Sequence, residues 1–174
     1  MPNLVIRPAA AADVAAIARI YAHAVRFGTA SFELEPPDEA EMARRQRAIV
    51  EAGYPYLVAQ ADGAVLGYAY VGPYRARPAY RWSVENSIYV AAEAQRRGIG
   101  RALIEALIAE TERRGFRQMI AVIGDAAQMP SIALHRAVGF RLIGALEAVG
   151  FKHGRWLDTV LMQRPLGPGA TTNP

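Results

Sequence analysis

The chain has 174 residues, no cysteine and a formal net charge of +4 at pH 7, from 20 basic and 16 acidic side chains. This length predicts one domain with a core large enough to fold without cross-links, and the lack of cysteine excludes disulfides and thiolate metal sites. No apolar run approaches the roughly 20 residues of a membrane span, and the first residues lack the pattern of a signal peptide. We therefore expect a cytoplasmic protein with no membrane partner and no metal site.

The sequence is basic, with a pI of about 9.7, and this raises the question of nucleic-acid binding. Nineteen of the 20 basic residues are arginine, and Lys152 is the only lysine. The arginines form no dense run with interleaved aromatic residues. We therefore expect no nucleic-acid partner, since the excess charge suits an anionic small molecule equally well.

The first half of the chain predicts a strand, two helices and a hairpin. Asp13 precedes apolar residues at helical spacing, which predicts a helix that Asp13 caps. Alternating apolar residues on both sides of Asp62-Gly63 indicate two strands joined by a tight turn. The expected elements are strands over residues 4–7, 55–60 and 65–71, a helix starting after Asp13 and a second helix over residues 39–51.

The second half predicts alternating strands and helices followed by a hairpin. The expected elements are strands over residues 88–90, 117–123, 142–151 and 155–163 and helices over residues 101–115 and 131–138. The order β-α-α-β-β-β-α-β-α-β-β indicates a mixed α/β domain and not a doubly wound sheet, because βαβ units do not alternate throughout. Residues 1–165 are expected to form this domain, and residues 166–174, which are poor in large apolar side chains, a flexible tail.

A turn rich in arginine and glycine joins the strand at 88–90 to the next helix. Residues 95–100 read Gln-Arg-Arg-Gly-Ile-Gly, and the two glycines let the backbone approach a ligand closely. The helix start offers free N–H groups and a positive dipole end, and Arg96, Arg97 and Arg101 add charge suited to phosphate. A dinucleotide fingerprint is excluded by Leu103 in place of its third glycine, and no P-loop string exists. The segment predicts a pyrophosphate site, with a plain tight connection as the alternative.

The pattern Gln/Arg-x-x-Gly-x-Gly/Ala in this turn resembles the acetyl-coenzyme A loop of the GNAT acetyltransferase superfamily. Four further strings resemble its phosphinothricin acetyltransferase branch. They are Glu-Asn-Ser-Ile-Tyr-Val at 85–90, Ala-Val-Ile-Gly at 121–124, Leu-His-Arg-Ala-Val-Gly-Phe at 134–140 and Gly-Phe-Lys-His-Gly-Arg-Trp at 150–156. The resemblance implies the GNAT fold, a single-domain α/β architecture whose twisted, mostly antiparallel sheet is flanked by helices and contains a splayed central strand pair.

The same resemblance implies an activity. It identifies acetyl-coenzyme A as the acyl donor and the α-amino group of a small amino acid or analogue as the acceptor. Phosphinothricin, methionine sulfoximine and methionine sulfone are the acceptors that the branch suggests. Acetylation of protein N-termini or polyamines is the alternative within the fold, and a catalytically silent sensor of acetyl-coenzyme A is the alternative outside catalysis.

Acetyl transfer requires a base for the amine, and two residues match the positions that the branch uses. A free α-amino group has an ordinary pKa of about 8, so a nearby carboxylate suffices to remove its proton. The resemblance assigns Glu85 as the general base, acting directly or through water, and His135 as its partner acid or second base. A surface glutamate and a packed helix histidine are the alternative interpretations. A backbone N–H near Tyr89 is expected to polarise the thioester oxygen.

The resemblance also implies binding contacts. The family carries asparagine where Gln128 stands, so the contact of that amide with the pantetheine chain depends on the longer side chain. The expected coenzyme contacts are Ile88, Tyr89, Val90, Gln95, Arg96, Arg97, Gly98, Ile99, Gly100, Arg101, Gln128 and Ser131. Guanidinium groups bind carboxylates and phosphinates in fork geometry, and aromatic rings enclose an aliphatic stem. The expected substrate contacts are Phe32, Tyr74, Arg75, Arg77 and Tyr80, with a solvated basic loop as the alternative.

The family is usually dimeric, so the resemblance implies a homodimer. Trp156 and the strands beside it are the residues expected at that contact.

Overall fold

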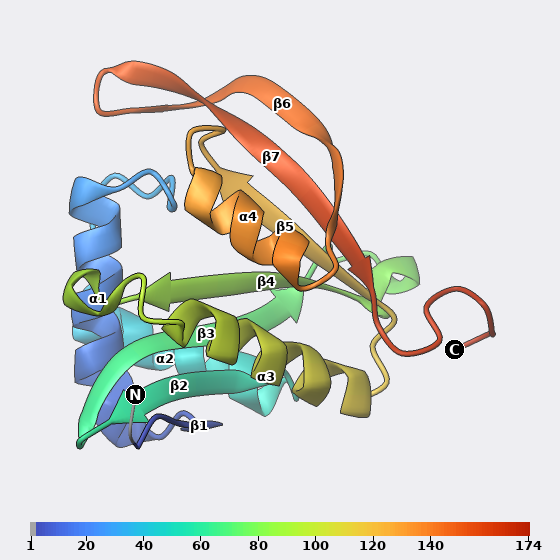
Figure 1. Ribbon diagram of the computed structural model, residues 1–174, viewed down its shortest axis with the longest axis horizontal. Helices are drawn as coiled ribbons and strands as arrows, with labels where there is room; N and C mark the ends of the chain where they lie inside the picture. Colours follow the sequence, from blue (N-terminus) through green and yellow to red (C-terminus); the bar gives the residue numbers. More distant parts are fainter. Residues whose placement is uncertain (1–2) are drawn as a thin grey trace.

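An open seven-stranded sheet runs through the computed structural model, which describes residues 3–174 (Figure 1). Its strand order is β1-β2-β3-β4-β5-β7-β6, and every neighbouring pair is antiparallel except β4 and β5. The strands are β1 (Val5–Pro8), β2 (Tyr56–Ala61), β3 (Ala64–Pro73), β4 (Ser83–Val90), β5 (Gln118–Gly124), β6 (Arg141–Lys152) and β7 (Arg155–Pro165). The predicted mixed, mostly antiparallel architecture is confirmed.

Within residues 3–174, four α-helices pack on this sheet: α1 (Val14–Phe27), α2 (Glu39–Glu51), α3 (Ile99–Arg113) and α4 (Met129–Ala137). Side chains alternate along β3 and so assign the two faces. A Cβ atom added at Gly67 would meet Leu103 and Ile99 of α3 at 3.1 and 3.4 Å. Tyr68 and Tyr70 point to the opposite face, where they line a cavity with residues of α1 and α2. Helices α1 and α2 therefore cover one face, and α3 covers the other (Figure 1).

The helices bury the apolar stripes that their sequences predict. The buried residues of α1 are the five of the predicted face, Val14, Ile17, Ile20, Tyr21 and Val25. In α3, Leu103, Ile104 and Leu107 are completely buried against the sheet. Burial of each such aliphatic side chain contributes about 1.5–3 kcal/mol. Within residues 3–174, no helix combines the length and the apolar character that a membrane crossing needs.

The parallel ladder between β4 and β5 is short and creates the gap on which the site is built. It joins residues 83–86 of β4 to residues 118–121 of β5. Beyond Asn86, β4 continues to Val90 beside β3, while β5 continues to Gly124 beside β7. The two strands therefore separate toward their carboxyl ends, as the resemblance to a splayed central pair predicts. The backbone groups of residues 87–90 on the β5 side have no strand partner.

Strand β4 begins at Ser83, five residues before the predicted start at residue 88. The polar triplet Glu85, Asn86 and Ser87 interrupts the apolar run, so the pattern of the sequence hides its extended conformation. The predicted hairpin at Asp62-Gly63 is confirmed: both residues have positive φ, 49° and 80°, the conformation that a tight two-residue turn needs.

Asp13 stands at the predicted N-cap position of α1, but its side chain makes no capping hydrogen bond to that helix, because a short 3-10 turn over Ala11–Asp13 precedes it. Its carboxylate accepts hydrogen bonds from the backbone N–H of Ala10 at 2.7 Å and from the Arg7 guanidinium at 2.7 and 2.8 Å. The Arg7 guanidinium holds the pKa of this carboxyl below its usual range. The pair ties β1 to the start of α1.

Leu166, the first residue of the expected tail, packs with the domain. Leu166 is completely buried in the core, and its backbone N–H donates to Arg117 O at 2.9 Å. The Arg117 guanidinium also donates to Gly169 O, Thr172 Oγ1 and Asn173 O. A leucine after Pro165 is a weak signal in the sequence, because a single apolar residue has no periodicity. The flexibility of the last residues stays a prediction.

The burial of Leu166 predicts a cost for its removal. We expect Leu166→Ala to lower the free energy of unfolding by about 2–5 kcal/mol, because the change leaves a cavity in the core. Val50→Ala, at a side chain that is 49% exposed, should change it by no more than about 0.5 kcal/mol. Urea denaturation of both variants measures the difference. Equal, small effects would mean that Leu166 belongs to a loose tail.

Candidate active site

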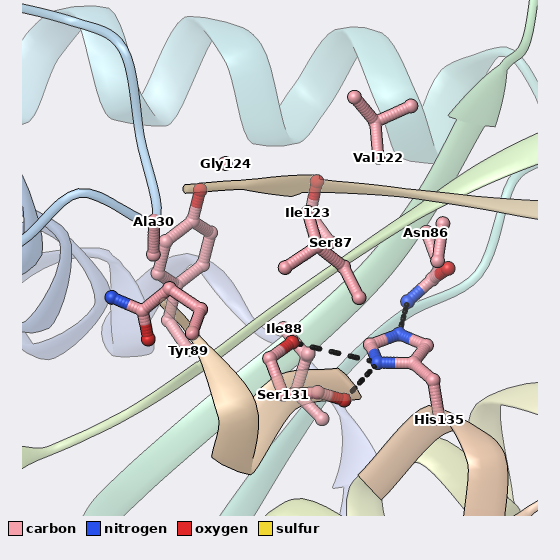
Figure 2. A pocket seen from close by; sticks show the side chains of 12 residues that line it. Ala30, Asn86, Ser87, Ile88, Tyr89, Val122, Ile123, Gly124, Ser131 and His135 are labelled. Atoms are coloured by element: carbon pink, nitrogen blue, oxygen red, sulfur yellow. Dashed lines mark hydrogen bonds between the residues drawn. The ribbon is translucent and has the colours of Figure 1, made fainter. Parts of the chain in front are cut away.

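Two connected cavities occupy the gap between β4 and β5. The larger one, about 520 Å³, extends from the gap to the first turn of α3 and falls within the range of small-molecule pockets. The smaller one, about 60 Å³, lies between the separated strands and against α4 (Figure 2). Five residues line both cavities: Ala30, Ile88, Tyr89, Gln128 and Ser131. The two cavities therefore form one continuous cleft.

The structure brings ten of the twelve predicted coenzyme residues to the larger cavity. They are Ile88, Tyr89, Val90, Gln95, Arg96, Gly98, Gly100, Arg101, Gln128 and Ser131. Arg97 is exposed and does not line the cavity. The side chain of Ile99 is 1% exposed and packs in the core, because the first residue of α3 faces the sheet.

The turn before α3 has the geometry of an anion site. Gly98 has a φ of +80° and stands immediately before the helix, whose first turn has no side-chain cap. The N–H groups of this turn are thus open to a ligand at the positive end of the helix dipole. Arg96 and Arg101 line the same cavity. An anionic group of pyrophosphate type fits this end of the cleft by charge and by hydrogen-bonding capacity.

Gln128 lines both cavities, and its side-chain amide is hydrogen-bonded within the protein. Its Nε2 donates to Thr29 Oγ1 at 3.0 Å, and Thr29 Oγ1 donates to Asp125 Oδ2 at 3.0 Å. Hydrogen bonds from Ala127 N, Thr29 and Arg155 stabilise the charged form of Asp125 and keep the pKa of its carboxyl below the usual range. The network holds the loop after α1 against the start of α4. Sequence reasoning missed Thr29 and Asp125, although Asp125 follows directly on the matched 121–124 string.

Glu85 and His135 lie on opposite faces of β4. Glu85 pairs with Gly72 of β3, whose added Cβ would meet Ile49 of α2 at 3.4 Å, so Glu85 shares the face of α1 and α2. The neighbouring Asn86 points to the α3 face and contacts His135 of α4 at 2.9 Å. Burial raises the pKa of the Glu85 carboxyl, and the positive charge of Arg75 acts in the opposite direction. A carboxyl with a raised pKa is suited to accept a proton at neutral pH.

His135 is almost completely buried, and both of its ring nitrogens are bonded inside the protein. Its Nδ1 lies 2.8 Å from the backbone oxygen of Ser131, and its Nε2 lies 2.9 Å from Nδ2 of Asn86 (Figure 2). Its ring packs edge-on against Phe140, with centroids 5.0 Å apart. Burial lowers the pKa of the imidazole, and the bond to Ser131 acts in the opposite direction. His135 therefore has no free ring nitrogen with which to act as the expected acid or base.

The predicted substrate residues fall into two groups. Phe32 packs against Gly124 and Gly150, where an added Cβ would come within 2.8 Å of its ring or closer. Only glycine leaves room for this ring, and Gly124 also lines the smaller cavity. Phe32 thus lies at the open end of the strand gap.

The other four substrate residues lie on the loop between β3 and β4. The rings of Tyr74 and Tyr80 meet edge to face with centroids 5.7 Å apart, and the Arg75 guanidinium lies 5.2 Å from the Tyr74 ring centroid. Arg77 is exposed at the start of a short 3-10 turn. Of these residues, Arg75 is the one whose charge acts on Glu85.

A third cavity, of about 280 Å³, lies on the Glu85 face of the sheet. Four tyrosines of α1, β2 and β3 line it together with Arg45 of α2: Tyr21, Tyr56, Tyr68 and Tyr70. Arg45 also donates to Glu33 at 2.6 Å, and Tyr21 donates to Glu33 at 3.0 Å. Sequence reasoning missed this cavity, although Tyr68 and Tyr70 stand two apart on a strand and so share a face. Among residues 3–174, no cluster of His, Cys, Asp and Glu has a metal-binding arrangement.

The fold and the cleft define a class of acyl-transferring protein, and comparison with known proteins gives the family. Residues 6–161 match the family described as Acetyltransferase (GNAT) domain. The chain belongs to the GNAT acetyltransferases.

Similar proteins come from within this family. The chain is 54% identical over 162 residues to the phosphinothricin N-acetyltransferase of Alcaligenes faecalis, covering 93% of this chain and 82% of that protein. It is 41% identical over 164 residues to the L-methionine sulfoximine/L-methionine sulfone acetyltransferase of Pseudomonas paraeruginosa, covering 94% and 95%. A crystal structure of a phosphinothricin acetyltransferase from Sinorhizobium meliloti in complex with acetyl-coenzyme A superposes with a TM-score of 0.96. That protein is 54% identical, and the match covers 99% of this chain and 93% of that one.

The conformation of Gly98 predicts a binding defect when it is substituted. We expect Gly98→Ala to weaken the binding of coenzyme A, because an L-residue at φ +80° is strained and shifts the N–H groups of the first turn. Gly53→Ala is the matched control: Gly53 also has a φ of +83° and open space at its Cβ position, but it lies between α2 and β2.

Calorimetric titration with coenzyme A and a thermal melt of both variants measure the effects. Both variants should lose about 1–2 kcal/mol of stability, and only Gly98→Ala should lose affinity. An unchanged affinity in Gly98→Ala would contradict the assignment of this turn to the coenzyme.

Proposed function

We propose that the protein transfers the acetyl group of acetyl-coenzyme A to the α-amino group of a small amino acid or analogue. Phosphinothricin, methionine sulfoximine and methionine sulfone are the acceptors to test first. One observation carries the proposal: a continuous cleft joins the open N-terminus of α3 to the gap between β4 and β5. The names and the bound acetyl-coenzyme A of the similar proteins support it.

In this proposal the first turn of α3, with Arg96 and Arg101, holds the pyrophosphate. The pantetheine arm then follows the cleft past Ser131 and Gln128 toward the strand gap. A backbone N–H of β4 near Tyr89, which has no β5 partner, donates to the thioester oxygen and stabilises the negative charge that develops there. Gln128 takes the place of the family asparagine and binds the pantetheine chain through its amide oxygen, while its Nε2 keeps the hydrogen bond to Thr29.

Glu85 removes the proton from the amine, directly or through water. Two observations support this role. Burial raises the pKa of the Glu85 carboxyl, and Glu85 belongs to the third of the four residue pairs between β4 and β5, just before the gap opens. We assign proton removal to Glu85 alone, since both ring nitrogens of His135 are engaged.

The acceptor lies on the Glu85 face in this proposal. Arg75, with Arg77 on the same exposed loop, binds the α-carboxylate in fork geometry, and Tyr74 and Tyr80 enclose the stem. Phe32 closes the open end of the gap. A polyamine acceptor is disfavoured, because two guanidinium groups in the acceptor loop repel a polycation.

The homodimer stays a prediction, and the exposed apolar side chains of the β6–β7 hairpin support it. Leu142, Leu146, Val149, Phe151 and Trp156 are each about half exposed or more, between 49% and 65%. Such a surface is typical of an interaction site. The expected cytoplasmic location also stays a prediction.

The proposal is tested with a panel of amines in a thiol-release assay with acetyl-coenzyme A. The panel contains the three analogues, the common amino acids, a polyamine and a peptide with a free N-terminus. We expect the highest kcat/KM for an amino acid or analogue, and Glu85→Gln should lower kcat by a factor of about 10²–10⁴ without weakening coenzyme binding. If none of the amines in the panel produced thiol release, the silent sensor would be favoured. Full turnover by Glu85→Gln at pH 7 would contradict the role of Glu85 as base.

Arg75 should influence both substrate affinity and the pH profile. Glu85 must be ionised to accept a proton, so activity falls as the pH drops through its pKa. Arg75 lowers that pKa; Arg75→Ala should therefore move the acidic limb of kcat/KM to higher pH. It should also raise KM for the amino acid about tenfold or more, with little effect on KM for the coenzyme.

Arg81→Ala is the control for this experiment. Arg81 is exposed on the same loop and lies over Trp82, with its guanidinium 5.2 Å from that ring centroid, so the acidic limb should stay in place. An identical response of both variants would show a general charge effect and refute the specific role of Arg75.

A further inference from the structure

Asn86 is a buried polar residue that neither the coenzyme nor the acceptor assignment uses. It stands at the end of the parallel ladder, paired with Ala121, where β4 and β5 separate. Its side chain is directed at His135, with 2.9 Å between Nδ2 and Nε2 (Figure 2). Its Oδ1 is buried and has no hydrogen-bond partner. An unpaired buried acceptor destabilises the fold, so the hydrogen bond that Nδ2 makes with His135 is the interaction that this orientation of the amide keeps.

The contacts of His135 determine where its proton lies. The backbone oxygen of Ser131 only accepts hydrogen bonds, and it lies 2.8 Å from Nδ1. Nδ1 therefore carries a hydrogen. Since Nδ2 of Asn86 is a donor, Nε2 offers its lone pair. The imidazole is then neutral, in the Nδ1-protonated form.

The opposite orientation of the Asn86 amide requires a charged ring. With Oδ1 facing Nε2, both ring nitrogens of His135 would carry a hydrogen. His135 is 2% exposed, and its ring contacts Ser131 of α4, Asn86 of β4 and Phe140 immediately before β6. Among the described residues, no charged side chain acts on it. A buried imidazolium without a counter-charge is strongly disfavoured.

We propose that Asn86 is a positioning residue for His135: it fixes the neutral Nδ1-protonated form and occupies the only lone pair of the ring. His135 then exchanges no proton with the reacting groups. The pair instead ties α4 to β4 at the point where the strands separate, and so holds Ser131 in the wall of the cleft. The proton of the amine is left to Glu85 on the other face of β4.

The protonation of His135 is measured in the wild-type protein by long-range ¹H–¹⁵N correlation spectra of ¹⁵N-labelled histidine. We expect a protonated Nδ1 and an unprotonated Nε2 across the neutral pH range. His23 and His153 are exposed to solvent and serve as internal references. A proton on Nε2, alone or together with Nδ1, would overturn the proposal.

Two variants test the role of Asn86 directly. Asn86→Asp places a carboxylate beside Nε2, so His135 should become charged at neutral pH, and the pH profile of kcat/KM should gain a histidine ionisation that the wild type lacks. Asn86→Leu removes the donor at similar volume, so the ¹⁵N chemical shift of the unprotonated Nε2 should move to that of a nitrogen without a hydrogen bond. Unchanged spectra and profiles in both variants would refute the proposal. Where the leucine variant does not fold, the wild-type spectrum and the aspartate variant decide.

Gln46→Leu is the matched control. Gln46 is a buried amide of α2, 6% exposed, that bonds to Ala10 O outside the cleft, so its loss should leave the His135 signals unchanged. The kinetic arm rests on the proposed function, while the spectroscopic arm does not. An active enzyme with a proton on Nε2 would overturn this inference alone, and inactivity toward the amine panel would overturn the proposed function alone.

Discussion

The early end of the ladder between β4 and β5 is the constraint on which the cleft depends. Four residues of each strand are paired, and both strands then continue beside other partners, β4 beside β3 and β5 beside β7. Each strand stays hydrogen-bonded to its other neighbour, so the sheet remains continuous on both sides of the gap. The gap exposes backbone groups of β4 to a ligand, which a complete ladder would have used for the sheet itself.

Alternation along β4 divides the chemistry between two faces. Glu85 points toward α1 and α2, and Asn86 points toward α4, because neighbouring residues of a strand face opposite sides. The resemblance to the family pairs Glu85 with His135 in catalysis. In the structure the two side chains lie on opposite faces of β4, and both ring nitrogens of His135 are hydrogen-bonded to Asn86 and Ser131. In the proposed mechanism the acceptor and the base therefore lie on one side of β4, and the residues that support the wall of the cleft lie on the other.

Much of the fold was accessible from the sequence because it rests on local signals. The buried face of α1, the extent of α2 and the hairpin at Asp62-Gly63 follow from periodicity and turn chemistry. The first half of β4 was not accessible, since its polar residues serve the site and not the core. Leu166 was missed because a single apolar residue carries no period.

The candidate site was predicted in part. The glycines and arginines of residues 95–100 predict an anion-binding turn, and most of these residues line the cleft. Arg97 and Ile99 do not line the cleft, because Arg97 is exposed outside it and the side chain of Ile99 packs in the core. The role of Asn86 could not be predicted from the sequence, since it depends on a histidine 49 positions away in the chain.

A crystal structure of the protein with acetyl-coenzyme A tests the central claim most directly. The account predicts the pyrophosphate on the first turn of α3 and the thioester in the gap between β4 and β5, with its oxygen within hydrogen-bond distance of a β4 backbone N–H near Tyr89. A coenzyme whose thioester lies outside the gap, for example in the tyrosine-lined cavity beneath α2, would contradict it.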